Sequence, residues 1–229
     1  MPRATRRPPT PADLAPRWRL ARPVQARSHE TIDLFARAAE ELLATRPFEE
    51  ITVQDIVRRA KRPIGSFYAR FGSKDALLPY LYQRYHDGLE TVVASRLQRV
   101  AWDALGFEET VERLVDFVLA NLTDRPWLIR ALALFSRTNP EALPDDLARR
   151  RRGVIDLIVP ILLEHRSRIA HADPEKAIRF GVYLVSTVAR EKLLFADAPL
   201  SRVTPMSRTA LRRELIHTLH AYLSHEASS

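Results

Sequence analysis

The segment RRAKRPIGSFYARFGSK, residues 58–74, carries six Lys or Arg side chains and no acidic one. It also contains Ile64, Phe67, Tyr68 and Phe71. Guanidinium and ammonium groups bind phosphate oxygens through charge-assisted hydrogen bonds, so this stretch could form a surface for a polyanion. A solvated basic face is the simpler alternative, and the elements that position these side chains decide between the two.

Positive charge is concentrated in two segments of the 229-residue chain. Residues 1–27 contain seven Arg and one Asp, and together with 58–74 they hold a charge of +12. The net charge of the chain is +8, so the remainder sums to −4. Charge gathered in this way favours a polyanionic partner for the N-terminal part. Residues 1–27 also contain six of the sixteen prolines, which predicts a disordered basic arm that solubilises the chain or follows a phosphate backbone.

The sequence offers little material for catalysis or for metal binding. It contains no cysteine, and no P-loop, G-x-S-x-G or H-E-x-x-H motif. The histidines at 165, 171, 217 and 220 lack a third ligand or a Glu-x-x-His set. We therefore expect no enzyme activity, no metal site and no cofactor.

Helical periodicity begins at Ser28 and continues through the chain without strand-like alternation. Apolar residues recur at spacings of three and four up to Leu43, and Thr52 is placed to cap a short second helix. Pro63 suits the first turn of a third helix, which Gly72 ends.

Ser73 is expected to cap a fourth helix, in which Pro79 bends the first turns. Further breaks lie near 106, 124–126, 139–140, 172–174 and 197–205, and no apolar run is long enough to span a membrane. The prediction is an all-α fold of about nine helices. Its parts are the disordered arm (1–27), a three-helix domain (28–75) and a larger C-terminal helical domain (76–229).

The second and third helices have the layout of a helix-turn-helix, in which the second helix of the pair lies in a DNA major groove. Phe67 and Phe71 are four residues apart and should pack on the first two helices. The opposite side of the helix presents Ile64, Ser66, Tyr68 and Arg70 to DNA.

The stretch ITVQDIVRRAKRPIGSFYARFGSKDALL, residues 51–78, resembles the DNA-binding signature of TetR family regulators. The resemblance implies a phosphate contact from Tyr68, and another from Lys74 at the start of the fourth helix, where free amides favour an anion. It also implies a phosphate contact from Thr52, close backbone approach at Gly65 and a base or phosphate contact from Ser66. The candidate DNA-binding residues are Thr52, Arg62, Ile64, Gly65, Ser66, Tyr68, Arg70 and Lys74.

The turn departs from the family pattern, since Lys61-Arg62-Pro63 stands where Gly-Val-Ser is usual. A lysine held at positive φ would be strained, unless the turn takes another path. Arg62 stands where a small apolar side chain normally packs inward, so its side chain must point to solvent or the backbone must shift. Pro63 replaces a residue whose hydroxyl would cap the third helix.

The resemblance further implies a C-terminal domain that dimerises and encloses a small, largely apolar effector. The candidate pocket residues are Trp102, Phe107, Phe117, Trp127, Phe135 and Tyr183. Apolar stripes at 178–189 and 211–222 fit either a dimer interface or, more simply, an intramolecular core. The basic run 149–152 is interpreted as a solvated face, paired with Asp145 and Asp146.

These features together predict a cytoplasmic, homodimeric DNA-binding regulator, most simply a ligand-responsive repressor on a two-fold symmetric operator in double-stranded DNA. A non-specific nucleoid-binding protein is one alternative, because the basic arm and irregular turn suit phosphate contacts alone. A helical small-molecule-binding module that does not bind DNA is the other. Either DNA-binding interpretation predicts that changes at Tyr68 and Lys74 weaken binding.

Overall fold

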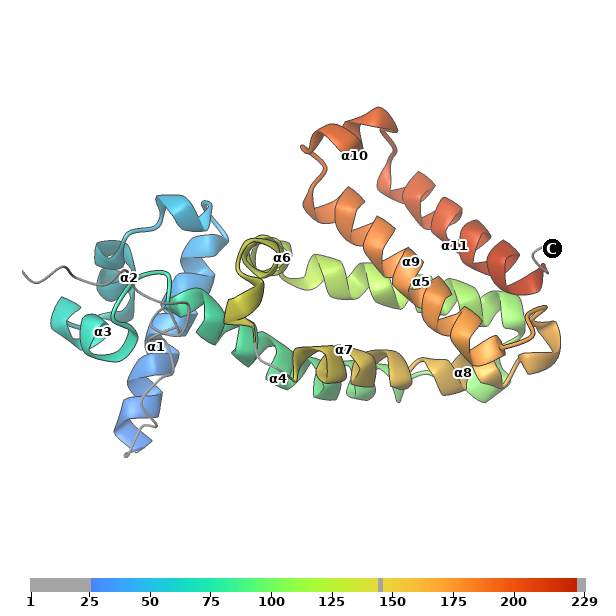
Figure 1. Ribbon diagram of the computed structural model, residues 1–229, viewed down its shortest axis with the longest axis horizontal. Helices are drawn as coiled ribbons and strands as arrows, with labels where there is room; N and C mark the ends of the chain where they lie inside the picture. Colours follow the sequence, from blue (N-terminus) through green and yellow to red (C-terminus); the bar gives the residue numbers. More distant parts are fainter. Residues whose placement is uncertain (1–25, 144–145, 226–229) are drawn as a thin grey trace, which may run out of the picture. The chain divides into compact units, whose positions relative to one another are not determined.

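The computed structural model describes residues 26–143 and 146–225, and this part of the chain is helical without any strand. The predicted arm at 1–27 lies almost wholly outside these residues. The α-helices, coloured from blue to red in Figure 1, are α1 (Ala26–Leu43), α2 (Val53–Ala60), α3 (Ile64–Phe71), α4 (Leu77–Leu97), α5 (Phe107–Asp124), α6 (Pro126–Thr138), α7 (Leu147–Asp156), α8 (Val159–Leu163), α9 (Pro174–Leu194), α10 (Pro199–Val203) and α11 (Arg208–Ser224).

The all-α prediction is confirmed. Two of the eleven α-helices in the described residues, α8 and α10, are only five residues long, and the other nine match the number expected from periodicity. The chain leaves the α-helical conformation at each of the predicted breaks. The break between α7 and α8 at 157–158 and the end of α8 at Leu163 were not predicted, and α4 begins at Leu77 and not after Ser73. The Ser73 hydroxyl still accepts a hydrogen bond from the Ala76 amide (3.3 Å), so residues 73–76 form a capped turn before the helix.

The chain divides into two compact units. The N-terminal unit contains residues 26–81 with 139–142, and the C-terminal unit contains 82–138 with the described residues from 143 onward. Within these two units, no helix has the length and apolar character needed to cross a bilayer.

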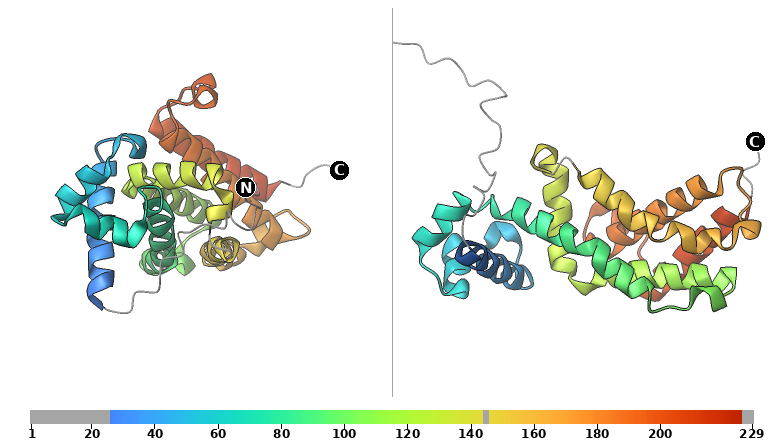
Figure 2. Two further views of the ribbon diagram at one scale, coloured as in Figure 1. Left: turned by 60° about the vertical axis from the view of Figure 1, so that its left-hand side comes forward. Right: turned by 90° about the horizontal axis from the view of Figure 1, so that it is seen from below.

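Aromatic packing holds the N-terminal unit together. Phe35 of α1 and Phe67 of α3 are fully buried, with ring centroids 5.3 Å apart at an edge-to-face angle. Phe71 lies 6.2 Å from Phe35, and Ile56 of α2 is completely buried as well. The first three helices, blue to cyan in Figure 2, therefore share one core, as the four-residue spacing of the two phenylalanines predicts.

The C-terminal unit is built around α5, α9 and α11, which pack on one another (Figure 1). Their buried faces contain the two stripes noted in the sequence, such as Ile178 and Val185 on α9 and Leu215 on α11. A Cβ at Gly181 would lie 2.7 Å from Leu219 Cδ1, so the glycine permits this close approach. The stripes form an intramolecular core, which was the simpler of the two interpretations.

Candidate nucleic-acid interface

The turn between α2 and α3 keeps the left-handed conformation despite its unusual sequence. Lys61 has φ 52° and ψ 48°, and it is the sole non-glycine residue with positive φ in the part of the chain that the structure describes. Its amide bonds to the Arg58 carbonyl (3.2 Å), and the Arg62 amide bonds to the Val57 carbonyl (3.0 Å). These two hydrogen bonds end α2 as in a helix with a left-handed C-terminal cap. Lys61, which has a β-carbon, thus adopts a backbone conformation that favours glycine.

Lys61→Gly is expected to raise the free energy of unfolding by about 0.5–1 kcal/mol, because it removes the steric cost of the left-handed conformation. Lys61→Ala is the matched control, since it removes the same charge but keeps the β-carbon. Urea denaturation of both variants tests the prediction, and equal stability of the two would contradict it.

Arg62 and Pro63 connect this turn to α3. The Arg62 side chain is exposed and donates to the Lys61 carbonyl (3.3 Å), so it has turned outward. Pro63 is the residue before the helix, with φ −65° and ψ 147°, and makes no side-chain cap. The sequence placed Pro63 in the first turn, but α3 begins one residue later, at Ile64.

Helix α3 has two faces of different character. Phe67 is completely buried and Phe71 is 5% exposed, whereas Ile64 and Tyr68 are 40% and 47% exposed. Burial of these two side chains contributes little to the stability of the fold, because much of their surface stays in water. That surface is available for contact with a partner. The unit thus holds α3 by one face and presents the other, as a groove-binding helix requires.

Gly65, Ser66 and Arg70 lie on or beside this exposed face. A β-carbon at Gly65 would meet no atom within 4 Å, so no packing inside the free protein requires the glycine. The Arg70 guanidinium donates to the Ser66 hydroxyl (2.8 Å) and to the Ser66 carbonyl (2.9 Å). The Ser66 hydroxyl accepts in this pair and so keeps its own hydrogen for a DNA contact, and the guanidinium keeps further N–H donors.

Thr52 caps α2 in a reciprocal arrangement with Asp55. The Thr52 hydroxyl accepts from the Asp55 amide (3.1 Å), and the Asp55 carboxylate accepts from the Thr52 amide (3.0 Å) and hydroxyl (2.7 Å). Hydrogen bonds from the hydroxyl and then the amide of Thr52 lower the pKa of Asp55, with help from Arg46 at 2.9 Å. The predicted cap is confirmed, while the phosphate contact from Thr52 stays a prediction.

The Lys74 ammonium is already occupied in this structure. It donates to the carbonyls of Phe48 (3.0 Å), Glu49 (3.3 Å) and Ile51 (3.0 Å), and lies 4.6 Å from the centre of the Phe48 ring. These carbonyls belong to the 3₁₀ turn Phe48–Glu50 and the residue after it. Lys74 thus holds this turn to the start of α4, a role that its motif position did not reveal.

Three exposed cations surround the start of α3. Besides Arg62, the Arg58 and Lys61 side chains are exposed to solvent. Arg58 makes a long ion pair with Asp55 (3.7 Å). The sequence reasoning did not single out Arg58 and Lys61 as DNA contacts, although their charge within the basic stretch was the available signal.

The six aromatic pocket candidates do not gather at one place. Phe107 and Phe135 are buried, and Trp102 is anchored by its indole N–H, which donates to the Leu97 carbonyl (2.8 Å). Phe117 is half-buried against the core, whereas Trp127 and Tyr183 are 38% and 59% exposed. A ligand role for each of them stays a prediction.

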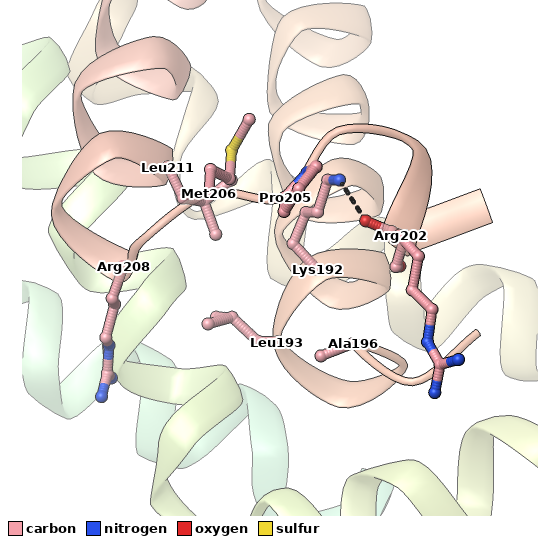
Figure 3. Close-up of a pocket in the computed structure, with 9 residues that line it drawn as sticks. Lys192, Leu193, Ala196, Arg202, Pro205, Met206, Arg208 and Leu211 are labelled. Carbon is pink, nitrogen blue, oxygen red and sulfur yellow. Dashed lines mark hydrogen bonds between the residues drawn. The ribbon is translucent and has the colours of Figure 1, made fainter. Parts of the chain in front are cut away.

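A surface pocket of about 540 Å³ lies where α9, α10 and α11 meet (Figure 3). Its Lys192 ammonium donates to the carbonyls of Ser201 (2.9 Å) and Thr204 (2.7 Å) and so fastens α10 to α9. None of the six aromatic candidates lines this pocket. In the described residues, no group of three His, Cys, Asp or Glu side chains could hold a metal ion.

The packed α1–α3 unit, with its exposed basic and aromatic α3 surface, is a helix-turn-helix module of the DNA-binding type. Residues 36–81 match the model of the bacterial regulatory proteins, tetR family. This match confirms the TetR-type resemblance of the N-terminal segment, which the sequence motif at 51–78 predicts.

Comparisons with individual proteins agree with this assignment. An uncharacterised HTH-type transcriptional regulator of Bacillus subtilis (strain 168), YwcC, is 26% identical over 113 residues, which span 48% of this chain and 51% of that protein, about half of its length. A crystal structure from Mesorhizobium loti MAFF303099, assigned to the TetR family, superposes with a TM-score of 0.62 at 16% identity over 87% of this chain and 98% of that one. A TetR-family regulator from Streptomyces coelicolor gives 0.54 at 22% identity over 86% and 97%. The two structures share the fold of this chain.

Proposed function

We propose that this chain is a homodimeric transcriptional repressor, which binds a two-fold symmetric operator through α3 and releases it when a small effector binds the C-terminal unit. The exposed face of α3 carries the proposal. Ile64 and Tyr68 project from a helix that Phe67 anchors, beside the exposed cations Lys61 and Arg62. Apolar and hydroxyl groups flanked by positive charge suit base edges and phosphates in a major groove.

Dimerisation is supported by the solvent-facing side of α9. Phe180 and Tyr183 are 51% and 59% exposed, and the Phe180 ring lies 5.5 Å from that of Tyr222 on α11. Exposed aromatic residues in a cluster are typical of a protein interface. A symmetric dimer would present two α3 helices to half-sites about one helical turn apart, roughly 34–36 Å.

Repression would respond to an effector through a difference in binding free energy. Such an effector prefers a dimer conformation in which the two recognition helices are wrongly spaced for the operator. In that conformation the dimer loses one of its two sets of groove contacts. The loss of operator affinity cannot exceed the effector's preference for that conformation.

Selection of bound duplexes from a random DNA pool at about 150 mM salt tests the proposal, because backbone attraction alone is weak there. Enrichment of a two-fold symmetric site is the expected result. Binding without enrichment would favour the non-specific alternative, for which the exposed cations around Lys61 are the supporting observation. No binding at all would favour a small-molecule module.

Tyr68→Phe is expected to weaken binding to the selected site about tenfold, since it removes a hydroxyl that can donate to a charged phosphate. The side chain is 47% exposed, so thermal stability should not change. Fluorescence anisotropy titration measures the affinity. Tyr80→Phe is the tyrosine control, because the hydroxyl that it removes donates to Asp33 (3.0 Å) and does not belong to the exposed face of α3. Equal affinity of Tyr68→Phe and the unmodified protein would exclude the hydroxyl contact.

A further inference from the structure

A surface pocket with a concentrated positive charge lies where α9, α10 and α11 meet (Figure 3). Its volume is about 540 Å³, within the range of about 300–1,000 Å³ that is usual for small-molecule sites. Lys192, Arg202 and Arg208 line it, and no Asp or Glu is among the described residues that do so. A pocket of this size and charge suits a small organic anion.

Polar contacts fasten α10 to α9 and so hold the pocket in shape. The Lys192 ammonium donates to the carbonyls of Ser201 (2.9 Å) and Thr204 (2.7 Å). Ser201 is buried, and its hydroxyl donates to the Glu191 carbonyl (3.2 Å). The wall that α10 provides is therefore fixed before any ligand binds, which lowers the entropy cost of binding.

Apolar side chains form the middle of the pocket. Leu211 of α11 is 3% exposed, Leu193 belongs to the last turn of α9, and Ala196 follows that helix. Figure 3 shows Leu193 and Ala196 between Arg202 on one side and Arg208 on the other. A molecule that lies across the pocket would therefore meet apolar carbon in its middle and a guanidinium group at each end.

Arg202 and Arg208 are available to a ligand. Both residues are exposed, and neither side chain makes a hydrogen bond or an ion pair within residues 26–143 and 146–225. Hydrogen bonds from Arg130 lower the pKa of Asp197, and the charge of Arg202 lowers it further. The Asp197 carboxylate is held by Arg130 at 2.8 and 3.1 Å, so this acidic group already has its partner.

The position of Arg208 in its helix adds to the attraction for an anion. Arg208 is the first residue of α11, and the first turn of this helix contains no acidic side chain. A cation at the positive end of a helix is unfavourable. Arg212, one turn later, has carboxylate partners in Asp116 (2.9 Å) and Glu112 (3.3 Å). An anion bound at Arg208 would compensate both the side-chain charge and the helix dipole.

We propose that this pocket binds an organic dianion, whose two acidic groups are held by Arg202 and Arg208 and whose apolar middle packs on Leu193 and Leu211. Dicarboxylates with an aliphatic spacer between the two acidic groups are the simplest members of this class. The planar guanidinium holds a carboxylate through two parallel hydrogen bonds. The site goes beyond the proposed function, because binding there requires neither DNA nor a dimer.

Isothermal titration calorimetry of the full chain without DNA tests the binding step. Glutarate, adipate and suberate are compared with pentanoate, hexanoate and octanoate, the monoanions of the same chain lengths, at matched ionic strength. At least one dianion should bind with one molecule per chain and about tenfold more tightly than its monoanion, because it gains a second charged contact. If no dianion binds, or if each monoanion binds as tightly as its dianion, the proposal is overturned.

Two arginine variants locate the binding. Arg202→Met and Arg208→Met should each reduce the affinity for the dianion to about that of the monoanion, and circular dichroism should show an unchanged helix content, since both side chains are exposed. Arg213→Met is the matched control, because it removes an exposed arginine of α11 that does not line this pocket. Full affinity in both pocket variants, or an equal loss in Arg213→Met, would refute the site.

Discussion

Replacing Phe67 with alanine is expected to lower the free energy of unfolding of the N-terminal unit by about 3–5 kcal/mol. Phe67 is completely buried, and its ring centroid lies 5.3 Å from that of Phe35 and 5.0 Å from that of Phe71. The truncation leaves a cavity at the point where α3 is held to α1. The free energy of unfolding of a small unit is itself small, so a loss of this size should unfold the unit and abolish operator binding.

Hydrogen exchange followed by mass spectrometry measures this effect for each unit separately. Peptides from α1–α3 should lose protection, whereas peptides from α5, α9 and α11 should keep it, because the C-terminal unit has a core of its own. Phe67→Leu is the matched control and should cost about 1.5 kcal/mol or less, since it refills most of the volume. A Phe67→Ala protein with undiminished protection in α3 would contradict the packing described here.

Much of this unit follows from local sequence alone. The spacing of Phe67 and Phe71 fixes which side of α3 is buried, and the reciprocal cap between Thr52 and Asp55 depends on residues three apart. Each of these features is determined within one or two helical turns, where periodicity and capping preferences operate.

Features that depend on distant residues were not predictable. Lys74 finds its acceptors 23–26 residues earlier in the chain, and Arg151 reaches the Tyr82 hydroxyl across 69 residues. The basic run 149–152 was interpreted as a solvated face, which fits the exposed side chains of Arg149, Arg151 and Arg152 and the ion pair from Arg149 to Asp146 (3.5 Å), but the bond from Arg151 to Tyr82 was not foreseen.

Lys74→Met is expected to lower the free energy of unfolding of the N-terminal unit by about 2 kcal/mol, because three carbonyls lose a charged donor. The loss should appear as a lower denaturation midpoint with an unchanged slope. Lys61→Met is the matched control, since it removes the same charge from an exposed side chain and should leave stability unchanged or slightly altered. Equal stability of the two methionine variants would mean that the carbonyl contacts contribute nothing.

The salt dependence of operator binding then decides between anchoring and phosphate contact at Lys74. A residue that contacts phosphate lowers the slope of log affinity against log salt by about one when its charge is removed. The Lys74 ammonium has three hydrogens, and three carbonyls within 3.3 Å already accept them. We therefore expect an unchanged slope for Lys74→Met and a smaller one for Lys61→Met, measured where both variants remain folded. A slope smaller by one for Lys74→Met would show that its ammonium leaves the carbonyls to meet DNA, so that operator binding would reorganise the turn at Phe48–Glu50.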